Sequence, residues 1–337
     1  MIIPVKTQIG SYNIYLERGA LRKIGEYFNL NRKVLIVTDT GVPSEYSKIV
    51  SDACKEAFIV TIEMGEKSKN IDNFKYLLEC MVKNNFTRSD CVVAVGGGVI
   101  GDLSGFAASA FMRGVDFYNV PTTVLSQVDS SIGGKTAVDF MGVKNIVGAF
   151  YQPKGVLIDS DTLKTLPDRQ ISNGLSEALK MSLTSDPVLF DIFENKDVLA
   201  NIDTVIERSL NVKKYVVEED EKEKGLRRIL NFGHTLAHAI ESVNDLSDLY
   251  HGECVAIGMV YMCSETVRKR LIPVLQKLRL PTETSLSVDE LISLCKHDKK
   301  AEGEKITVIY VDEVGKAEFK KMNFSEYEKL VKRVLKK

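Results

Sequence analysis

Short apolar runs alternate with an amphipathic segment in the first half of the chain. The runs cover residues 33–39, 58–62, 91–95, 117–120 and 155–159, and each is typical of a buried strand. Residues 71–84 carry apolar side chains at helical spacing. Strands that are separated by helices of this length indicate right-handed βαβ units and a mostly parallel sheet. The first half therefore predicts an α/β domain.

The pattern changes after residue 161, where helical periodicity dominates. It covers residues 169–183, 203–219, 232–243, 253–269 and 289–297, and only residues 306–311 resemble a strand. We find no internal repeat, low-complexity tract or flexible linker between the two halves. The sequence predicts an α/β domain over residues 1–160 and a mainly α-helical domain over residues 161–337, with a ligand in the cleft between them.

Composition narrows the class of protein. The 337 residues are 44% hydrophobic and 27% charged with a net charge of −1, which argues against disorder and against a basic surface for nucleic acid or acidic membranes. Residues 1–19 contain no apolar signal segment, and the longest apolar stretch, residues 91–101, is too short to span a bilayer. The six cysteines form no Cys-x-x-Cys pair, so a disulfide scaffold is unexpected. We expect a soluble cytoplasmic protein.

A glycine-rich turn follows the third predicted strand. Residues 96–102 read Gly-Gly-Gly-Val-Ile-Gly-Asp and open a helix, whose free amides and dipole favour a diphosphate. This motif alone is weak, because a tight turn with close helix packing explains the glycines equally well. Glycine, hydroxyl and cationic residues nearby favour phosphate binding; they lie at 113–114, 121–123, 129–135 and 144–145. No Walker motif is present, which excludes that class of ATPase.

Three of the four histidines fall within residues 234–251. His234 and His238 share one helix face at i, i+4, so spacing alone suggests them as a pair of metal ligands or as acid–base groups. Glu177 and Lys180 form a second candidate pair at i, i+3. For these two residues, an ordinary surface ion pair remains an equally open interpretation.

Taken in order, these motifs resemble the 3-dehydroquinate synthase family of sugar-phosphate cyclases. The matching segments run from about residue 30 to residue 310 and lie at 65–69, 96–102, 113–114, 121–123, 129–135, 144–145, 162–167, 177–180, 227, 231–241, 251–253 and 298–300. Two positions depart from the family pattern: Ala237 stands where glycine is common, and Asp139 stands where asparagine is common.

The resemblance implies a homodimer in which each chain has an N-terminal dinucleotide-binding domain and a C-terminal metal-binding domain. It implies Glu177, His234 and His251 as ligands of a divalent metal, zinc or alternatively cobalt, in place of the pair that spacing suggests. His238 then lines the substrate pocket. The implied substrate is 3-deoxy-arabino-heptulosonate 7-phosphate, which is cyclised to 3-dehydroquinate with loss of phosphate through transient oxidation by NAD.

The same resemblance assigns individual residues. It implies NAD contacts at Asp39, Glu66, Lys69, Gly98, Val99, Ile100, Gly101, Asp102, Thr122, Thr123, Lys135, Lys144, Thr162, Leu163, Lys164 and Thr165. It implies substrate contacts at Arg113 (from the other subunit), Lys135, Asn145, Lys213, Arg227, Asn231, His238, Lys299 and Lys300. Candidates for proton transfer and catalysis are Asp129, Lys135, Lys180 and His238.

Three alternatives remain open at this point. A metal-dependent polyol dehydrogenase has the same architecture, but its uncharged substrate does not need a set of cationic side chains. The chain carries such a set, which argues against this alternative: Lys135, Lys144, Lys213 and Arg227. A cyclase for an aminated substrate keeps the chemistry, although Lys213 with Arg227 favours a carboxylated one. A non-catalytic nucleotide-binding protein is disfavoured because every expected metal and phosphate position is retained.

Overall fold

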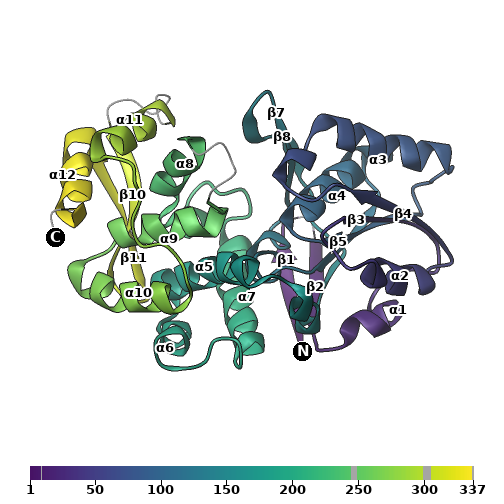
Figure 1. Ribbon diagram of the computed structural model, residues 1–337. Helices are drawn as coiled ribbons and strands as arrows, with labels where there is room; N and C mark the ends of the chain where they lie inside the picture. The colour runs from purple at the N-terminus through teal and green to yellow at the C-terminus, as the bar shows by residue number, and fades with distance from the viewer. Residues whose placement is uncertain (9, 244–248, 299–304, 336–337) are drawn as a thin grey trace. The chain divides into compact units, whose positions relative to one another are not determined.

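The structure is a computed structural model that describes residues 1–8, 10–243, 249–298 and 305–335 (Figure 1). The chain folds into two compact units. Unit 1 comprises Met1–Pro167 and Lys213–Lys222, and unit 2 comprises Asp168–Val212 and Glu223–Lys337. The boundary that the sequence suggests near residue 160 lies at the start of a short helix, η5 (Ser160–Thr165), which belongs to unit 1.

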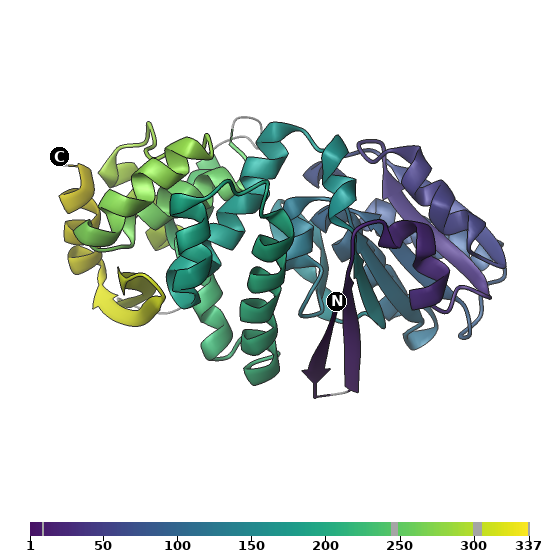
Figure 2. The same ribbon diagram turned by 90° about the horizontal axis from the view of Figure 1, so that it is seen from below.

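Unit 1 contains a seven-stranded sheet in the order β1-β2-β9-β6-β5-β3-β4. Its strands are β1 (Ile2–Thr7), β2 (Gly10–Leu16), β3 (Lys33–Asp39), β4 (Glu56–Ile62), β5 (Cys91–Gly96), β6 (Asp116–Pro121) and β9 (Gly155–Ile158). All five predicted strands are present and parallel to their neighbours. The sequence analysis missed β1 and β2, an antiparallel pair at one edge of the sheet (Figure 2).

Both faces of this sheet are covered, because consecutive residues of its central strands point to opposite sides. Leu35, Val37, Val92 and Ala94 pack in one apolar cluster with residues of α3 (Ile71–Lys83) and α4 (Gly98–Ala110). Val34, Ile36 and Val93 pack in a second cluster with residues of α1 (Ile24–Tyr27) and α2 (Ser44–Asp52). The continuous apolar runs that predicted buried strands therefore reflect burial on both sides.

Several short elements complete unit 1. They are the helical turns η1 (Ala20–Lys23), η2 (Glu66–Ser68), η3 (Phe111–Arg113) and η4 (Ser126–Ser130), together with the hairpin strands β7 (Lys135–Phe140) and β8 (Val143–Phe150). The antiparallel β7–β8 hairpin forms a small sheet of its own. Sequence analysis did not predict it, because β8 exposes most of its residues and lacks a buried apolar face.

Unit 2 is mainly helical. Its elements are α5 (Asp168–Ser185), α6 (Pro187–Asn195), the first part of α7 (Ile202–Glu219), η6 (Leu226–Asn231), α8 (His234–Val243), α9 (His251–Tyr261), α10 (Glu265–Lys277), α11 (Val288–Asp298), β10 (Lys305–Glu313), β11 (Lys316–Asn323) and α12 (Phe324–Leu335). None of the helices in the described part of the chain has both the length and the apolar character that crossing a membrane requires.

Two sequence predictions for unit 2 were wrong. The single helix expected over residues 253–269 is two helices, because the Ser264 side chain accepts a hydrogen bond from Val267 N and starts α10 as a new helix. The strand over residues 306–311 is not alone, because β10 pairs antiparallel with β11. β11 was missed because its lysine-rich sequence is largely exposed and shows little apolar alternation.

Two glycines let the helices of unit 2 approach each other closely. A Cβ atom added to Gly258 of α9 would lie 2.0 Å from the carbonyl oxygen of Gly233, which directly precedes α8. A Cβ atom on Gly252 would lie 2.0 Å from the carbonyl oxygen of Asn173 in α5. Helix α9 can therefore contact both neighbours at backbone distance only because these positions lack a side chain.

We predict that Gly258→Ala destabilises the protein by about 2 kcal/mol or more, because the added methyl group must displace backbone rather than a flexible side chain. Urea unfolding measures the effect. The control is Gly25→Ala in α1, where the nearest atom to the new Cβ is Ala53 Cβ at 3.8 Å. This control should leave stability unchanged or raise it by roughly 0.5 kcal/mol. Equal stability of the two variants would contradict the packing argument.

Candidate metal centre and dinucleotide-binding residues

Three side chains from three helices of unit 2 converge on one point. Glu177 lies in α5, His234 is the first residue of α8, and His251 is the first residue of α9. Each offers one ligand atom, and these three atoms all lie within 4.8 Å of one another. His238 is next to His234, with ring centroids 5.6 Å apart, but it is outside this group of three. The ligand pair suggested by spacing alone is therefore not the arrangement found.

Hydrogen bonds fix the orientation of both histidines. His234 Nδ1 lies 3.1 Å from the carbonyl oxygen of Phe232, and His251 Nδ1 lies 2.7 Å from Glu241 Oε1. Because a carbonyl and a carboxylate can only accept, each Nδ1 carries the proton and donates it. The Nε2 atoms point to Glu177 Oε1, at 3.8 Å from His234 and 3.4 Å from His251.

Glu177 is a charged carboxylate in the interior of unit 2, with 1% of its surface exposed. Burial by itself raises its pKa, but the ammonium of Lys180 and the two imidazoles outweigh that effect and hold the pKa well below the usual range. Lys180 is equally buried and donates a hydrogen bond to Glu177 Oε2. The surface ion pair left open by the sequence is thus a buried ion pair.

The two histidines differ in their electrostatic surroundings. Burial and the charge of Lys180 hold the pKa of His234 well below its usual value, which keeps that ring neutral. Burial also disfavours the charged form of His251, but the neighbouring carboxylates of Glu177 and Glu241 raise its pKa to about 9. Two carboxylates on either side of one ring make this point of the interior favourable for positive charge.

The residues present fit a divalent cation. Glu177 Oε1 is buried and makes no hydrogen bond within the described residues, although it lies close to both Nε2 atoms. One carboxylate oxygen and two imidazole nitrogens, with further positions open, are a donor set typical of a catalytic zinc site. Cobalt is chemically compatible with the same set.

Residues to which the sequence analysis assigned no role anchor His251. Gly252 N donates to Asn173 Oδ1 over 2.7 Å, and Tyr250 N donates to Glu253 Oε2 over 2.8 Å. Arg169 binds both oxygens of Glu253, at 2.7 and 2.8 Å. The only sequence signal for this anchor is a glutamate in the first turn of a predicted helix, which is too common to be specific.

In unit 1 the glycine turn connects β5 to α4, as the sequence predicts. An added Cβ would lie 2.8 Å from Ile100 at Gly96, 3.1 Å from Ser130 Oγ at Gly98 and 3.1 Å from Asn119 at Gly101. Close packing therefore favours glycine at these positions, while the start of α4 still offers free amides to an anion. The two interpretations of the motif, packing and phosphate binding, are compatible with each other.

A buried lysine joins two of the predicted cofactor residues. Lys69 Nζ lies 2.6 Å from Glu66 Oε1 and 3.4 Å from Asp102 Oδ2. Burial disfavours its charged form, but Asp102 and Glu66 outweigh this and raise the pKa of Lys69. Burial also raises the pKa of Asp102 to about 7 despite Lys69. An ion-pair network thus links η2 to α4.

Asp39 and η5 lie at another part of unit 1. Asp39 lines a depression of about 490 Å³ together with residues of the β3–α2 turn. Its Oδ1 accepts a hydrogen bond from Gly41 N, and burial raises its pKa. Tyr46 of α2 reaches η5, where its hydroxyl is 3.1 Å from Thr165 Oγ1. Asp39 therefore lies beside the start of α2, and Thr165 contacts the same helix through Tyr46.

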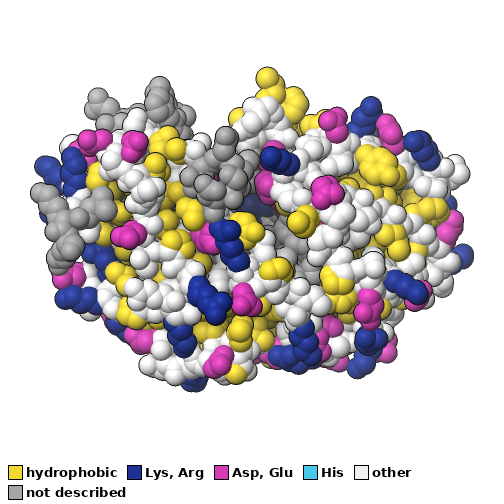
Figure 3. Space-filling model, viewed as in Figure 1, with side chains coloured by type: hydrophobic (Ala, Val, Ile, Leu, Met, Phe, Trp, Pro, Cys, Tyr) yellow, Lys and Arg dark blue, Asp and Glu magenta, His cyan; other side chains and the backbone are white. Residues whose placement is uncertain are grey.

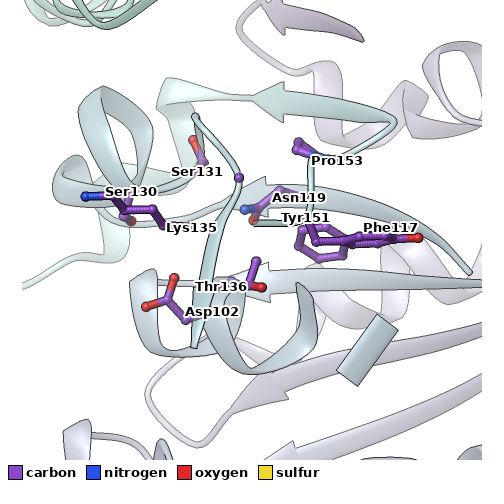
Figure 4. A pocket seen from close by; sticks show the side chains of 11 residues that line it. Asp102, Phe117, Asn119, Ser130, Ser131, Lys135, Thr136, Tyr151 and Pro153 are labelled. Carbon is purple, nitrogen blue, oxygen red and sulfur yellow. The ribbon is translucent and has the colours of Figure 1, made fainter. Parts of the chain in front are cut away.

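Beside α4 is a small cavity of about 10 Å³, which has room for about one water molecule. It is lined by Asp102, Asn119, Ser130, Ser131, Lys135, Tyr151 and neighbouring residues from α4, β6, η4 and β7 (Figure 4). The hydroxyls of Ser130 and Ser131 are buried there without a hydrogen-bond partner in the described residues. This cavity is too small for any part of a dinucleotide.

The remaining predicted site residues occupy several places. Four predicted cofactor residues make contacts within unit 1. Thr122 N donates a hydrogen bond to Gly96 O, and the Thr123 side chain is hydrogen-bonded to that of Ser126. Thr162 Oγ1 donates to Asp159 O, and Lys164 forms an ion pair with Asp161.

The predicted substrate and catalytic residues lie in both units. Asp129 and Lys213 form an ion pair in unit 1, and Arg227 and Asn231 lie in η6 of unit 2. Lys135 starts β7, whereas Lys144 and Asn145 follow the turn of the hairpin, and Arg113 is exposed in η3. Lys299 and Lys300 lie outside the described residues.

Comparison with known proteins agrees with this geometry. The family model for the N-terminal domain of 3-dehydroquinate synthase matches residues 59–173, and the family model for its C-terminal domain matches residues 174–301. A 3-dehydroquinate synthase of Streptococcus thermophilus is 42% identical over 339 residues, which cover 94% of this chain and 96% of that protein. The chain belongs to the 3-dehydroquinate synthase family. The resemblance inferred from the sequence is thereby confirmed.

Solved structures with the same fold include two other synthases. The 2-epi-5-epi-valiolone synthase of Streptomyces hygroscopicus superposes with a TM-score of 0.87 at 26% identity, covering 98% of both chains. A 2-deoxy-scyllo-inosose synthase superposes with a TM-score of 0.88 at 24% identity, covering 99% of this chain and 100% of the other. The predicted fold class, an α/β N-terminal domain followed by a mainly helical one, is confirmed.

We predict that Glu177→Gln lowers the affinity for Zn²⁺ by about tenfold or more, because it removes the only negative charge among the three converging groups. It also leaves the Lys180 ammonium buried without its counter-charge, so the metal-free variant should lose about 3 kcal/mol of stability. Competition with a chromophoric chelator measures the affinity, and urea unfolding measures the stability.

The control for this variant is Glu194→Gln, which breaks a partly exposed ion pair with Arg270 elsewhere in unit 2. Such a pair contributes roughly 1 kcal/mol or less, so this control should keep both its metal affinity and most of its stability. An unchanged affinity in Glu177→Gln would show that Glu177 is not a ligand.

Proposed function

We propose that this enzyme is a 3-dehydroquinate synthase, a carbon–oxygen lyase that converts 3-deoxy-arabino-heptulosonate 7-phosphate into 3-dehydroquinate and inorganic phosphate. The observation that carries the proposal is the convergence of Glu177, His234 and His251 around a buried carboxylate oxygen that has no hydrogen bond to any residue the structure describes. Sequence identity of 42% to a 3-dehydroquinate synthase over 94% of the chain supports the same reaction.

The proposed cofactors are NAD and one divalent cation, zinc by preference and cobalt as an alternative. The glycine turn at the start of α4 and the Asp39 depression support the dinucleotide, and the three converging groups support the cation. The 2-epi-5-epi-valiolone synthase structure, 26% identical, contains NAD⁺ and Zn²⁺. When bound, NAD supplies a reversible hydride acceptor and the cation supplies a Lewis acid.

The residues of the chain would hold and move charge around the substrate. Lys180 is fixed against Glu177 in the interior, so its ammonium is a preorganised donor for a substrate oxygen. His238, beside His234, is a candidate proton acceptor. The Asp129–Lys213 pair offers a second carboxylate, with a cation that suits an anionic substrate. The reaction oxidises an alcohol, eliminates phosphate, reduces the ketone and closes the ring by an aldol step, so it has no net redox change.

We expect many molecules of phosphate to be released per molecule of NAD, without accumulation of NADH, when zinc-loaded protein is incubated with the heptulosonate phosphate and catalytic NAD. Phosphate release and absorbance at the NADH band are followed together. NADH that rises in step with substrate loss would instead indicate a polyol dehydrogenase. If neither signal moves, an amino-substituted substrate tests the related cyclase activity. The role in carboxylate binding that we propose for Lys213 and Arg227 argues against that activity.

The homodimer is also proposed, with the β7–β8 hairpin in contact with the second copy. Five large apolar side chains of this hairpin are exposed: Phe140, Met141, Val143, Ile146 and Phe150. Figure 3 shows hydrophobic side chains at the tip of the hairpin. An exposed apolar surface of this kind marks an association site. The same hairpin carries Lys144 and Asn145, so a second copy would also hold residues of the proposed active site in place.

We predict that replacing Met141 and Ile146 together by Asp converts a dimer into a monomer, because charge replaces side chains that are 87% and 61% exposed in the single chain. Light scattering coupled to size exclusion measures the mass. The control is Val82→Asp near the end of α3, an exposed apolar residue that is not part of the hairpin. A wild-type monomer, or a double variant that remains dimeric, would contradict the assignment.

A further inference from the structure

Glu241 lies beside the candidate metal centre without being one of its three converging groups. It follows His234 by seven residues and His238 by three on α8, so the three side chains share one helix face. Its carboxylate is mostly buried, with 11% of the side chain exposed, and its Oε1 is 2.7 Å from His251 Nδ1. A short, charge-assisted hydrogen bond therefore joins α8 to the first residue of α9.

We propose that Glu241 is a positioning residue that fixes the tautomer and the ring orientation of His251, so that Nε2 is presented to the divalent cation. This inference rests on the metal site of the proposed function. A carboxylate accepts the Nδ1 proton, which leaves the lone pair of the ring on Nε2, the atom 3.4 Å from Glu177 Oε1. Such a hydrogen bond also makes the ring a more basic ligand.

The backbone and the ring of His251 are held from different helices. The backbone is fixed from α5, where Asn173 Oδ1 accepts from Gly252 N and where the lack of a Cβ at Gly252 permits the close approach. These contacts leave the ring free to rotate about its side-chain bonds. The hydrogen bond to Glu241 of α8 removes that freedom, because it is directional and short.

The two histidines use different acceptors for the same purpose. His234 is oriented by a backbone carbonyl, that of Phe232, at 3.1 Å, whereas His251 is oriented by a charged side chain at 2.7 Å. The backbone acceptor cannot be removed by substitution, but the carboxylate can. The pair therefore provides an internal comparison: changes at position 241 should affect His251 and leave the orientation of His234 unchanged.

The experiment measures Zn²⁺ affinity of the full-length protein by competition with a chromophoric chelator, for wild type, Glu241→Gln and Glu241→Ala. Outer partners of this type typically contribute a factor of about 10–100 in metal affinity. We expect the alanine variant to lose about that much and the glutamine variant to lose less, because an amide oxygen still accepts the Nδ1 proton but carries no charge. The visible spectrum of the Co²⁺-loaded protein should change in the same order.

Two controls separate positioning from other effects. Glu283→Gln removes an exposed carboxylate of unit 2 and should leave the affinity unchanged. Thermal unfolding of the metal-free variants tests folding, and the glutamine variant, which keeps the size of the side chain, remains informative if the alanine variant does not fold. Positioning is supported if the ranking wild type, glutamine, alanine holds in folded proteins.

The outcomes distinguish this inference from the proposed function. Suppose that the wild-type protein binds one Zn²⁺ and that Glu177→Gln weakens this binding. If both Glu241 variants then bind Zn²⁺ as tightly as wild type and give an unchanged Co²⁺ spectrum, the positioning role is wrong and the metal site stands. If wild type does not bind Zn²⁺, the metal site of the proposed function fails, and the role of Glu241 fails with it.

Discussion

Much of unit 2 depends on one buried negative charge. Glu177 is almost completely excluded from solvent, and an unpaired carboxylate in that position would be strongly destabilising. Lys180 balances the charge from the next turn of α5, and the rings of His234 and His251 face the remaining oxygen. Because one oxygen is neutralised by the lysine and the other faces two imidazole nitrogens, the same residues that make the burial tolerable also create a place for a cation.

The convergence of three helices on that charge requires close packing of the backbone. Helix α9 reaches α5 at Gly252 and the start of α8 at Gly233 and Gly258, where no side chain fits. These contacts set the position of both histidines at the first residues of their helices. A site of this kind is held by rigid elements rather than by loops, which suits a reaction that needs fixed geometry.

In unit 1 the main constraint is different: backbone amides must stay available where the buried strand β5 ends and α4 begins. The glycines at the β5–α4 junction pack tightly against Ile100, Asn119 and Ser130, and they also let an anion approach the backbone at the start of α4. Lys69, buried between Glu66 and Asp102, connects this junction to η2. Packing and electrostatics therefore act together on the same few residues.

The sequence by itself determined the parallel strands of unit 1, most helices of unit 2 and the family, because buried strands and amphipathic helices leave a local pattern and because the motifs occur in one order. It could not determine that β11 pairs with β10, since that strand is exposed and lysine-rich, or that residues 253–269 form two helices. Spacing along one helix suggested His234 with His238, whereas the family resemblance implied Glu177, His234 and His251. The tertiary structure shows how three helices bring these three side chains together, and it alone shows the contact between Glu241 and His251. Periodicity reports which side chains share a face of one element, whereas contacts between elements depend on how their backbones pack, and that information is not local in the sequence.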